Sequence, residues 1–435
     1  MNIIMLGAGY VGLVSGACFA EFGVNVTCVD PDESKIQRLH DGIIPIYEPG
    51  LDDLVKKNVE AGRLAFTTSL SKCVQKVDAI FIAVGTPTRR GDGHADLSYV
   101  YQAARDIANY LTEDHFTVVV TKSTVPIGTG REVEKNIRET NSKANFAVAS
   151  NPEFLREGSA IGDFMRPDRV VFGTNNAQAS EVMKALYRPL YLLETPIVQT
   201  TLESSELTKY AGNAFLATKI TFINEMADLC EKVGANVQDV ARGIGLDGRI
   251  GKKFLHAGPG YGGSCFPKDT LALVKTAQSV GSPVRIVETV VDINNKRKQS
   301  MADRVIAAAG GSVKGMKVAV LGVSFKPNTD DMRDSVALDV IPALQAAGAT
   351  VQAFDPVAMK EAERLLSDVK WMNDTYAALA DASVAVILTE WNEFRSLDFA
   401  RAKSLMASPI LVDLRNIYNP NEMVNTGFSY TSIGR

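Results

Sequence analysis

The amino-acid sequence predicts a protein of the α/β class, with two doubly wound parallel sheets joined by a long central helix and a small helical region. Three observations carry this prediction. Strand and helix patterns alternate at the amino-terminal end, a long stretch of helical spacing lies in the middle, and a second alternating unit follows it. At 435 residues the chain is too long for a single core and suits two or three domains.

The amino-terminal region is predicted to read strand, turn, helix, strand. Asn2–Leu6 is a short apolar run that suits a buried parallel strand. A glycine-rich turn follows directly, then a helix over Leu13–Phe22 and a second strand over Val24–Val29 that ends at Asp30. Later strands are predicted at Ala79–Val84, Thr117–Thr121 and Ala147–Ala149. A ligand of such a sheet is expected at the carboxyl ends of the strands.

The middle of the chain is predicted to be helical. From about Ser204 to Val233 there is no proline and only one glycine, Gly212, and the apolar residues recur at helical spacing. Gly234 is expected to break this long helix, and shorter helices should follow up to about Arg304.

A second α/β unit follows and resembles the first. The segment 317–322 (Lys-Val-Ala-Val-Leu-Gly) is similar to 2–7, and 348–356 is similar to 23–31, both ending in Asp-Pro. This similarity indicates an internal duplication of the fold. Because no further glycines follow Gly322, the second copy is expected to bind a different ligand.

Composition and charge exclude several classes of function. The chain is 46% hydrophobic and 22% charged, as in ordinary globular proteins, and its net charge of −4 gives no reason to expect nucleic acid. The four histidines show no metal-ligand spacing, so no metal site is predicted. An odd number of cysteines without a CxxC pair argues against a disulfide framework and for a reduced, cytoplasmic location; they are Cys18, Cys28, Cys73, Cys230 and Cys265.

The uncharged stretch Met1–Ala20 could be mistaken for a signal peptide or a membrane span. It lacks the basic start and the small-residue cleavage site that a signal peptide needs. Its glycines at turn spacing fit a binding turn better, so no membrane partner is predicted.

The turn Gly7-Ala-Gly9-Tyr-Val-Gly12 predicts a dinucleotide site because it directly follows a strand and opens a helix. Gly7 should permit the tight turn, Gly9 the approach of a pyrophosphate, and Gly12 the packing of helix on strand. Asp30 can accept hydrogen bonds from both ribose hydroxyls, which favours NAD over NADP, although Lys35 weakens that preference. A flavin dinucleotide and a turn without ligand stay open as alternatives.

Gly258-Pro-Gly-Tyr-Gly-Gly-Ser-Cys265-Phe-Pro-Lys-Asp269 predicts a nucleophile. Its four glycines give an open backbone that can bring a thiol against a ligand, and Lys268 favours the thiolate, whereas Asp269 opposes it. A dehydrogenase needs such a thiol only to oxidise an aldehyde further, since the aldehyde must become a tetrahedral adduct before losing a second hydride. The other four cysteines lie in helix or strand patterns or among ordinary polar neighbours, and are interpreted as structural.

Together these segments resemble the UDP-glucose 6-dehydrogenase family, within the wider nucleotide-sugar dehydrogenases. The resemblance runs from the first strand to Val412-Asp-Leu-Arg415-Asn and is most specific at 262–269 (Gly-Gly-Ser-Cys-Phe-Pro-Lys-Asp). The segments 151–158 (Asn-Pro-Glu-Phe-Leu-Arg-Glu-Gly) and 209–215 (Lys-Tyr-Ala-Gly-Asn-Ala-Phe) are nearly as telling, whereas 166–173 and 249–254 support UDP-glucose itself less strongly.

The resemblance implies two successive NAD-dependent oxidations of UDP-glucose to UDP-glucuronate by a homodimer built on the central helix. It implies a Rossmann-like NAD-binding domain over residues 1–200, a central helical dimerisation region over 201–304, and a Rossmann-like UDP-sugar-binding domain over 305–435.

The resemblance also implies catalytic roles. Cys265 would form a thiohemiacetal and then a thioester. Lys209 would be a base or electrostatic partner of the alkoxide, with Asn213 on the same helix face. Asp269, with a water and Thr124, would form the accompanying acid–base group, and Glu153 would assist thioester hydrolysis. Alternatively, Lys209 and Asp269 form a surface ion pair, Glu153 and Glu157 only flank a turn, and Thr124 only ends a strand.

The resemblance further implies the binding residues. For the sugar nucleotide they are Glu153, Phe154, Leu155, Lys209, Asn213, Phe254, Gly258, Gly262, Lys326, Arg415 and, reaching into the neighbouring subunit, Arg249. For NAD they are the three turn glycines with Asp30 and Lys35, and also Tyr10, Val11, Thr86, Thr124, Glu157, Lys268 and Arg333. His256 stands where relatives vary and receives no role.

Three competing functions stay open. A GDP-mannose or UDP-N-acetylhexosamine dehydrogenase would use the same cysteine chemistry. A two-electron dehydrogenase of the 6-phosphogluconate or 2-hydroxyacid kind would have no use for Cys265 and would yield one NADH per substrate. A redox-sensing NAD-binding protein would carry a reactive Cys265 without turnover.

Overall fold

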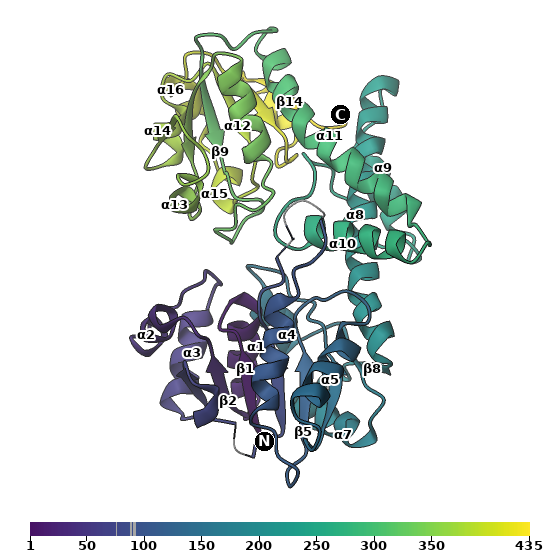
Figure 1. Cartoon of the computed structure of the whole chain (residues 1–435). Helices are drawn as coiled ribbons and strands as arrows, with labels where there is room; N and C mark the ends of the chain where they lie inside the picture. The colour runs from purple at the N-terminus through teal and green to yellow at the C-terminus, as the bar shows by residue number, and fades with distance from the viewer. Residues whose placement is uncertain (75, 88, 90–92) are drawn as a thin grey trace. The chain divides into compact units, whose positions relative to one another are not determined.

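In the computed structural model, the structure describes residues 1–74, 76–87, 89 and 93–435. The chain forms two compact units, one of residues 1–212 with 275–282, the other of 213–274 with 283–435. Each unit contains one sheet, and the long helix α8 (Leu202–Val233) begins in the first unit and ends in the second (Figure 1).

The first sheet has the order β3-β2-β1-β4-β5-β6-β7-β8. Neighbouring strands are parallel except β6 and β7, which meet in an antiparallel pair at Ser150 and Gly173. The strands are β1 (Asn2–Leu6), β2 (Asn25–Val29), β3 (Leu64–Thr67), β4 (Ala79–Ile82), β5 (Thr117–Thr121), β6 (Phe146–Ser150), β7 (Val170–Gly173) and β8 (Ile197–Thr200).

Helices cover both faces of this sheet, as a doubly wound fold requires (Figure 1). Alternate residues of β1 serve the two cores: Ile3 and Met5 pack with α1, α3, α6 and α7, whereas Ile4 and Leu6 pack with α4 and α5. The helices are α1 (Tyr10–Glu21), α2 (Glu33–His40), α3 (Leu51–Glu60), α4 (Ser98–Ala108), α5 (Thr129–Thr140), α6 (Ala160–Met165) and α7 (Ala177–Tyr187), with short 3-10 turns at Leu70–Lys72 and Arg188–Leu193.

Helix α1 begins at Tyr10, three residues before the predicted start, because Gly12 is part of the helix and not of the preceding turn. A Cβ at Gly12 would lie 1.8 Å from the Gly7 carbonyl oxygen, so only glycine lets the helix pack this closely on the strand. Gly7 has φ +100°, which confirms its predicted role in the tight turn. Gly9 has open space around it, as expected of a position approached by a ligand.

The central region is helical, as predicted. Helix α8 is broken at Gly234, which has φ +74°. The helices α9 (Val237–Gly245), α10 (Phe266–Ser279) and α11 (Arg285–Ala308) follow. No helix among the described residues is long and apolar enough to cross a membrane.

The second sheet is parallel throughout and has the order β11-β10-β9-β12-β13-β14. Counted from its first strand, this order equals that of β1 to β6, which confirms the predicted duplication. The strands are β9 (Lys317–Leu321), β10 (Thr350–Phe354), β11 (Val369–Trp371), β12 (Val384–Ile387), β13 (Ile410–Asp413) and β14 (Ser429–Ser432). The helices are α12 (Ala337–Ala346), α13 (Met359–Ala362), α14 (Thr375–Leu379), α15 (Asn392–Arg395), α16 (Phe399–Leu405) and α17 (Pro420–Val424).

The two copies use their aspartates differently. Asp355, the counterpart of Asp30, is fully buried and accepts hydrogen bonds from the backbone amides of Val323, Ser324, Val357 and Ala358 and from the side chains of Ser324 and Trp391. These donors occupy the carboxylate completely, so it has no capacity left for a ribose. The expectation of a different ligand in the second copy agrees with this difference.

Candidate active site

The first unit contains the predicted dinucleotide turn and its acid. Asp30 directly follows β2 and accepts hydrogen bonds from the Ala8 amide at 2.9 Å, the Asp32 amide at 3.1 Å and the Lys35 ammonium at 2.7 Å. Burial raises the pKa of Asp30, but the bonds from Lys35 and the two amides outweigh burial, so the net pKa is lowered. A carboxylate has about four acceptor positions. Lys35 therefore has to move before both ribose hydroxyls can bind.

Thr86 and Thr124 lie beyond the carboxyl ends of β4 and β5, which are neighbours in the sheet. The Thr86 hydroxyl donates to the Thr124 carbonyl at 3.0 Å and so joins the two loops. Their position, at the same edge as the glycine turn, fits a role in holding the cofactor.

The Tyr10 hydroxyl donates a hydrogen bond to the Glu48 carboxylate. The same Glu48 carboxylate accepts from the Gly158 and Ala160 amides at 2.6 and 2.7 Å. Burial, with the nearby charges of Glu48 and Glu157, raises the pKa of Tyr10. Glu48 thus connects Tyr10, in the first turn of α1, to the segment that directly follows Glu157. Val11 lies next to Tyr10 in the same turn.

Lys209 and Glu153 form a buried ion pair in the first unit. The Lys209 ammonium lies 3.2 Å from Glu153 Oε1, and Lys209 is only 3% exposed. The second Glu153 oxygen accepts from the Leu155 amide. The alternative of a surface ion pair for Lys209 is therefore wrong, whereas the alternative that Glu153 only flanks a turn stays open.

Phe154 stacks under two cations. The Arg169 guanidinium lies 3.7 Å from its ring centroid, and the Lys209 ammonium lies 5.3 Å from it. Phe154 therefore helps to fix the position of Lys209.

A second buried lysine lies near this pair and was not predicted. Lys122 donates to Asn151 Oδ1 at 3.0 Å and to the Tyr187 hydroxyl at 3.2 Å. Burial lowers the pKa of Lys122 to about 7; the charge of Glu153 opposes this shift, and that of Lys209 adds to it. Lys122 directly follows β5, whose three central residues are valines, but this local pattern does not indicate the partners of Lys122, which lie 29 and 65 residues away.

The second unit contains Cys265 directly before the first residue of α10. The Asp269 amide donates to the Cys265 carbonyl at 2.8 Å, which makes Cys265 the N-cap of a 14-residue helix. The thiol is partly exposed and lies 3.5 Å from the Ser264 hydroxyl. A helix N-terminus favours negative charge, as a reacting thiolate requires. Pro267 lies in the first turn of this helix, where proline is well tolerated.

Asp269 is buried beside Cys265 and has two partners. It accepts from Lys268 at 2.7 Å and from Asn213 Nδ2 at 2.6 Å. Since Asp269 is only 1% exposed, its interpretation as a surface ion pair is wrong. Asn213 lies one turn after Lys209 on α8, as the four-residue spacing predicted.

The segment before Cys265 is held tightly by buried polar groups. The Gly258 amide donates to Asn224 Oδ1 at 2.9 Å, and the Gly258 carbonyl accepts from Arg297 at 2.7 Å. A Cβ at Gly262 would lie 2.3 Å from the Asp334 carbonyl oxygen, so glycine is required there. Phe254 has φ +65°, and its ring centroid lies 6.1 Å from that of Phe266.

The predicted cationic residues of the second unit differ in environment. Arg415 is largely buried and donates to the carbonyls of Leu388 and Phe325. Lys326 lies 5.2 Å from the Phe325 ring centroid. Arg333 pairs with Asp331 at 2.8 Å, and the Arg249 side chain is 90% exposed and paired with Asp247.

The remaining cysteines fit structural roles. Cys18, Cys28 and Cys230 are buried and Cys73 is partly buried, and burial raises the pKa of Cys18 and of Cys28 to about 12. Within the part of the chain that the structure describes, no three His, Cys, Asp or Glu side chains gather in a way that could hold a metal ion.

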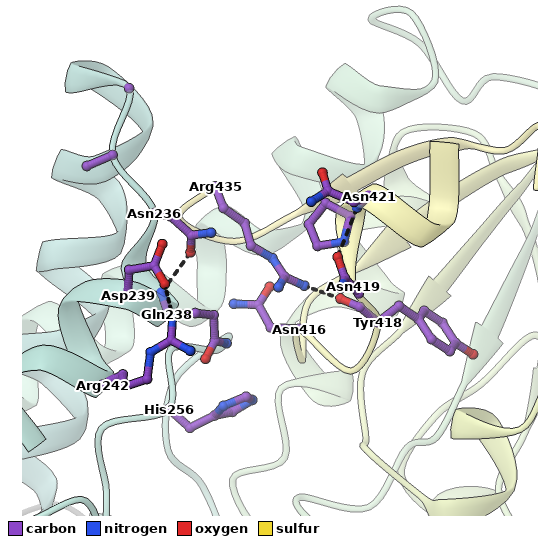
Figure 2. A pocket seen from close by; sticks show the side chains of 13 residues that line it. Asn236, Gln238, Asp239, Arg242, His256, Asn416, Tyr418, Asn419, Asn421 and Arg435 are labelled. Carbon is purple, nitrogen blue, oxygen red and sulfur yellow. Dashed lines mark hydrogen bonds and ion pairs between the residues drawn. The ribbon is translucent and has the colours of Figure 1, made fainter. Parts of the chain in front are cut away.

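A cavity of about 780 Å³ lies in the second unit, where the α8–α9 turn meets the segment after β13 (Figure 2). None of the described residues that line this cavity is one of the residues predicted for the active site. Its polar lining includes Arg242, His256, Asn416 and Arg435. His256 donates to the carbonyl of Arg415, so a residue of the cavity wall contacts a predicted substrate residue.

Comparison with known proteins matches the chain to the UDP-glucose/GDP-mannose dehydrogenase family in three parts. Residues 1–191 match its NAD binding domain, 203–296 its central domain and 319–420 its UDP binding domain. The chain is 66% identical over the full length of both chains to a UDP-glucose 6-dehydrogenase of Rhizobium meliloti (strain 1021). It is 49% identical to UDP-glucose 6-dehydrogenase TuaD of Bacillus subtilis (strain 168), covering all of this chain and 93% of that one.

A solved UDP-glucose dehydrogenase from the archaeon Pyrobaculum islandicum superposes with a TM-score of 0.90 at 38% identity. The match covers 99% of this chain and 96% of that one.

Proposed function

Because this chain belongs to the UDP-glucose/GDP-mannose dehydrogenase family, we propose that it oxidises the C6 alcohol of UDP-glucose to a carboxylate with two NAD, giving UDP-glucuronate. The observation that carries this proposal is Cys265 at the N-terminus of α10, whose first turn contains the buried Asp269, hydrogen-bonded to Lys268 and Asn213. A thiol so placed serves the second oxidation, which an alcohol dehydrogenase of the two-electron kind does not perform.

The first step removes a proton and a hydride from the alcohol. As an ammonium paired with Glu153, Lys209 stabilises the developing alkoxide, and the alcohol proton passes to the water beside Asp269. As a neutral amine, Lys209 takes that proton itself. NAD held by the glycine turn would supply the hydride acceptor, and a second NAD, bound after the first NADH has left, would supply it for the second oxidation. The product is an aldehyde.

The second step uses Cys265. Its sulfur bonds to the aldehyde carbon, and the oxygen becomes the hydroxyl of a thiohemiacetal; loss of the carbon-bound hydrogen as hydride, together with the hydroxyl proton, then gives a thioester. Water attacks that carbon, the carbon–sulfur bond breaks, and the thiol and the carboxylate are released. Glu153 assists this hydrolysis, and Asp269 with Thr124 and a water serves as the accompanying acid–base group.

Binding roles complete the proposal. NAD is held by the glycine turn, Tyr10, Val11, Asp30, Lys35, Thr86, Thr124, Glu157, Lys268 and Arg333. The sugar nucleotide is held by Glu153, Phe154, Leu155, Lys209, Asn213, Phe254, Gly258, Gly262, Lys326 and Arg415. We propose that the domains meet at residues 200 and 304. We also propose a reduced, cytoplasmic location, which fits the five cysteines without a disulfide.

We also propose a homodimer built on α8. Phe215, Phe222 and Leu229 follow one another at seven-residue intervals and are 66%, 46% and 51% exposed. Such spacing puts them on one face of the helix, and water-exposed stripes of large apolar residues mark protein contacts. The exposed Arg249 fits its expected use in the neighbouring subunit.

A substrate panel tests the proposal. With NAD in excess, the initial rate of NADH formation should give a kcat/KM for UDP-glucose about a hundredfold above those for GDP-mannose and UDP-N-acetylglucosamine. A higher value for either of the other two would replace the substrate assignment and leave the cysteine chemistry in place. No NADH with any of them would favour a redox-sensing protein.

A further inference from the structure

Arg415, the proposed substrate arginine after β13, uses most of its hydrogen-bonding groups in bonds to other residues of the second unit. Its amide donates to Asp413 Oδ1 at 3.0 Å, and its guanidinium Nε donates to the Leu388 carbonyl at 2.6 Å. Nη2 donates to the Phe325 carbonyl at 3.0 Å, and Glu390 lies 3.2 Å from Nε. Nη1 faces Gly258, 3.8 Å from where a Cβ on that glycine would lie. An arginine fixed in this way presents one defined edge to a ligand.

His256 fastens the one remaining backbone group of Arg415. Its ring nitrogen Nε2 lies 2.7 Å from the Arg415 carbonyl oxygen. A carbonyl can only accept a hydrogen bond, so Nε2 must carry the proton and donate. The bond connects the segment Leu255–Gly258 directly to Arg415, while Asn224 and Arg297 hold Gly258 from the other side.

The next residue, Asn416, has φ +53°, in the left-handed region, and its side chain bonds both backbone groups of Ile433 at 2.9 Å. His256 therefore holds the carbonyl of the peptide group that follows Arg415, and the Asn416 side chain fastens the next residue to the segment after β14. Both also line the cavity of Figure 2, which shows the His256 ring among the side chains around it.

We propose that His256 is a positioning residue for the sugar-nucleotide site, which holds Arg415 and the Gly258 loop in register through its hydrogen bond to the Arg415 carbonyl. The inference rests on the proposed function, since it acts through the contact of Arg415 with the substrate. It gives a role to a side chain that touches neither the reacting carbon nor NAD in the proposed mechanism.

The test compares His256→Ala with Arg242→Ala, which lines the same cavity but pairs with Asp239 instead of Arg415. His256→Ala should raise the KM for UDP-glucose about three- to tenfold, the size expected from one lost hydrogen bond. The KM for NAD and the kcat should change less than about twofold. His256→Gln, which keeps a donor, should recover part of the loss, and Arg242→Ala should resemble the wild type.

Imidazole gives a second readout that a general loss of structure would not produce. The cavity, at about 780 Å³, is large enough to admit free imidazole into the space left by His256→Ala. Added imidazole should then lower the raised KM for UDP-glucose towards the wild-type value and leave Arg242→Ala unaffected. Because His256 is exposed, we expect the variant to fold, and circular dichroism checks this.

Arg415→Ala separates failure of this inference from failure of the proposed function. If Arg415→Ala raises the KM for UDP-glucose but His256→Ala does not, the positioning role is overturned and the function stands. If Arg415→Ala leaves that KM unchanged, the assignment of Arg415 to the substrate itself is wrong, and the positioning role falls with it.

Discussion

At the scale of single residues, the dinucleotide turn separates two uses of glycine. Gly12 serves the fold, since a Cβ there would meet the Gly7 carbonyl oxygen. We propose that Gly9 serves the ligand, since its φ of −81° is open to any residue and a Cβ there would meet nothing within 4 Å. The motif is then expected to contain one position required by packing and one required by binding.

Alanine at each position tests this separation. Gly9→Ala should leave thermal stability within about 0.5 kcal/mol of the wild type but weaken NAD binding about tenfold or more, because the methyl group occupies the pyrophosphate's approach. Gly12→Ala should lower the unfolding free energy by about 2 kcal/mol or more, because backbone has to move. Thermal melts and NAD titrations measure both. Equal loss of stability in the two variants would contradict the separation.

The sequence predicted these residues well where a local motif defines them. The glycine turn, Asp30 and the shared helix face of Lys209 and Asn213 follow from motif and spacing. The burial of Lys209 and Asp269 does not, and a surface ion pair had stayed open for both. Lys122, Glu48 and His256 could not be found in this way, because their roles depend on partners between 29 and 159 residues away. Asp30 looked available to a ribose, and only the structure revealed that Lys35 holds its carboxylate.

At the scale of elements, α8 and α10 connect fold to function. Helix α8 carries Lys209 and Asn213 one turn apart, and α10 begins at the reactive cysteine. The long helix was predictable because proline is absent and glycine rare over its length. Shorter helices were predicted up to about Arg304, but the start of α10 at Phe266 was not, because the glycines before Cys265 indicate an open loop.

The exposed stripe on α8 gives a prediction at this scale. Phe222→Glu should convert the dimer to a monomer, because a charge in the middle of the stripe would be buried without a partner. Activity should fall at least about tenfold, since Arg249 of one subunit can then no longer reach the sugar-nucleotide site of the other. Val424→Glu is the control, because Val424 is also exposed, at 76%, but lies on α17. Analytical ultracentrifugation decides, and a dimeric, fully active Phe222→Glu would refute the proposed interface.

At the scale of the whole molecule, the two sheets show how one architecture takes two roles. The first six strands of the first sheet have the same order as the strands of the second. In the first sheet, the glycine turn after β1 leaves open space at Gly9. In the second, the aspartate after β10 accepts structural hydrogen bonds at both of its oxygens. The duplication was predictable from two similar segments. The extension of the first sheet by β7 and β8, with its antiparallel step, was not, since β8 is exposed and lacks the apolar run of a buried strand.

The measurement that tests the central claim most directly is the number of NADH formed per UDP-glucose consumed, for the wild type and for Cys265→Ser. Two NADH per sugar are predicted for the wild type. The variant should stall at the aldehyde or as a covalent adduct, because a serine hydroxyl is a far weaker nucleophile at neutral pH than a thiolate. One NADH per sugar, unchanged by the loss of Cys265, would contradict the four-electron mechanism and the role of this cysteine.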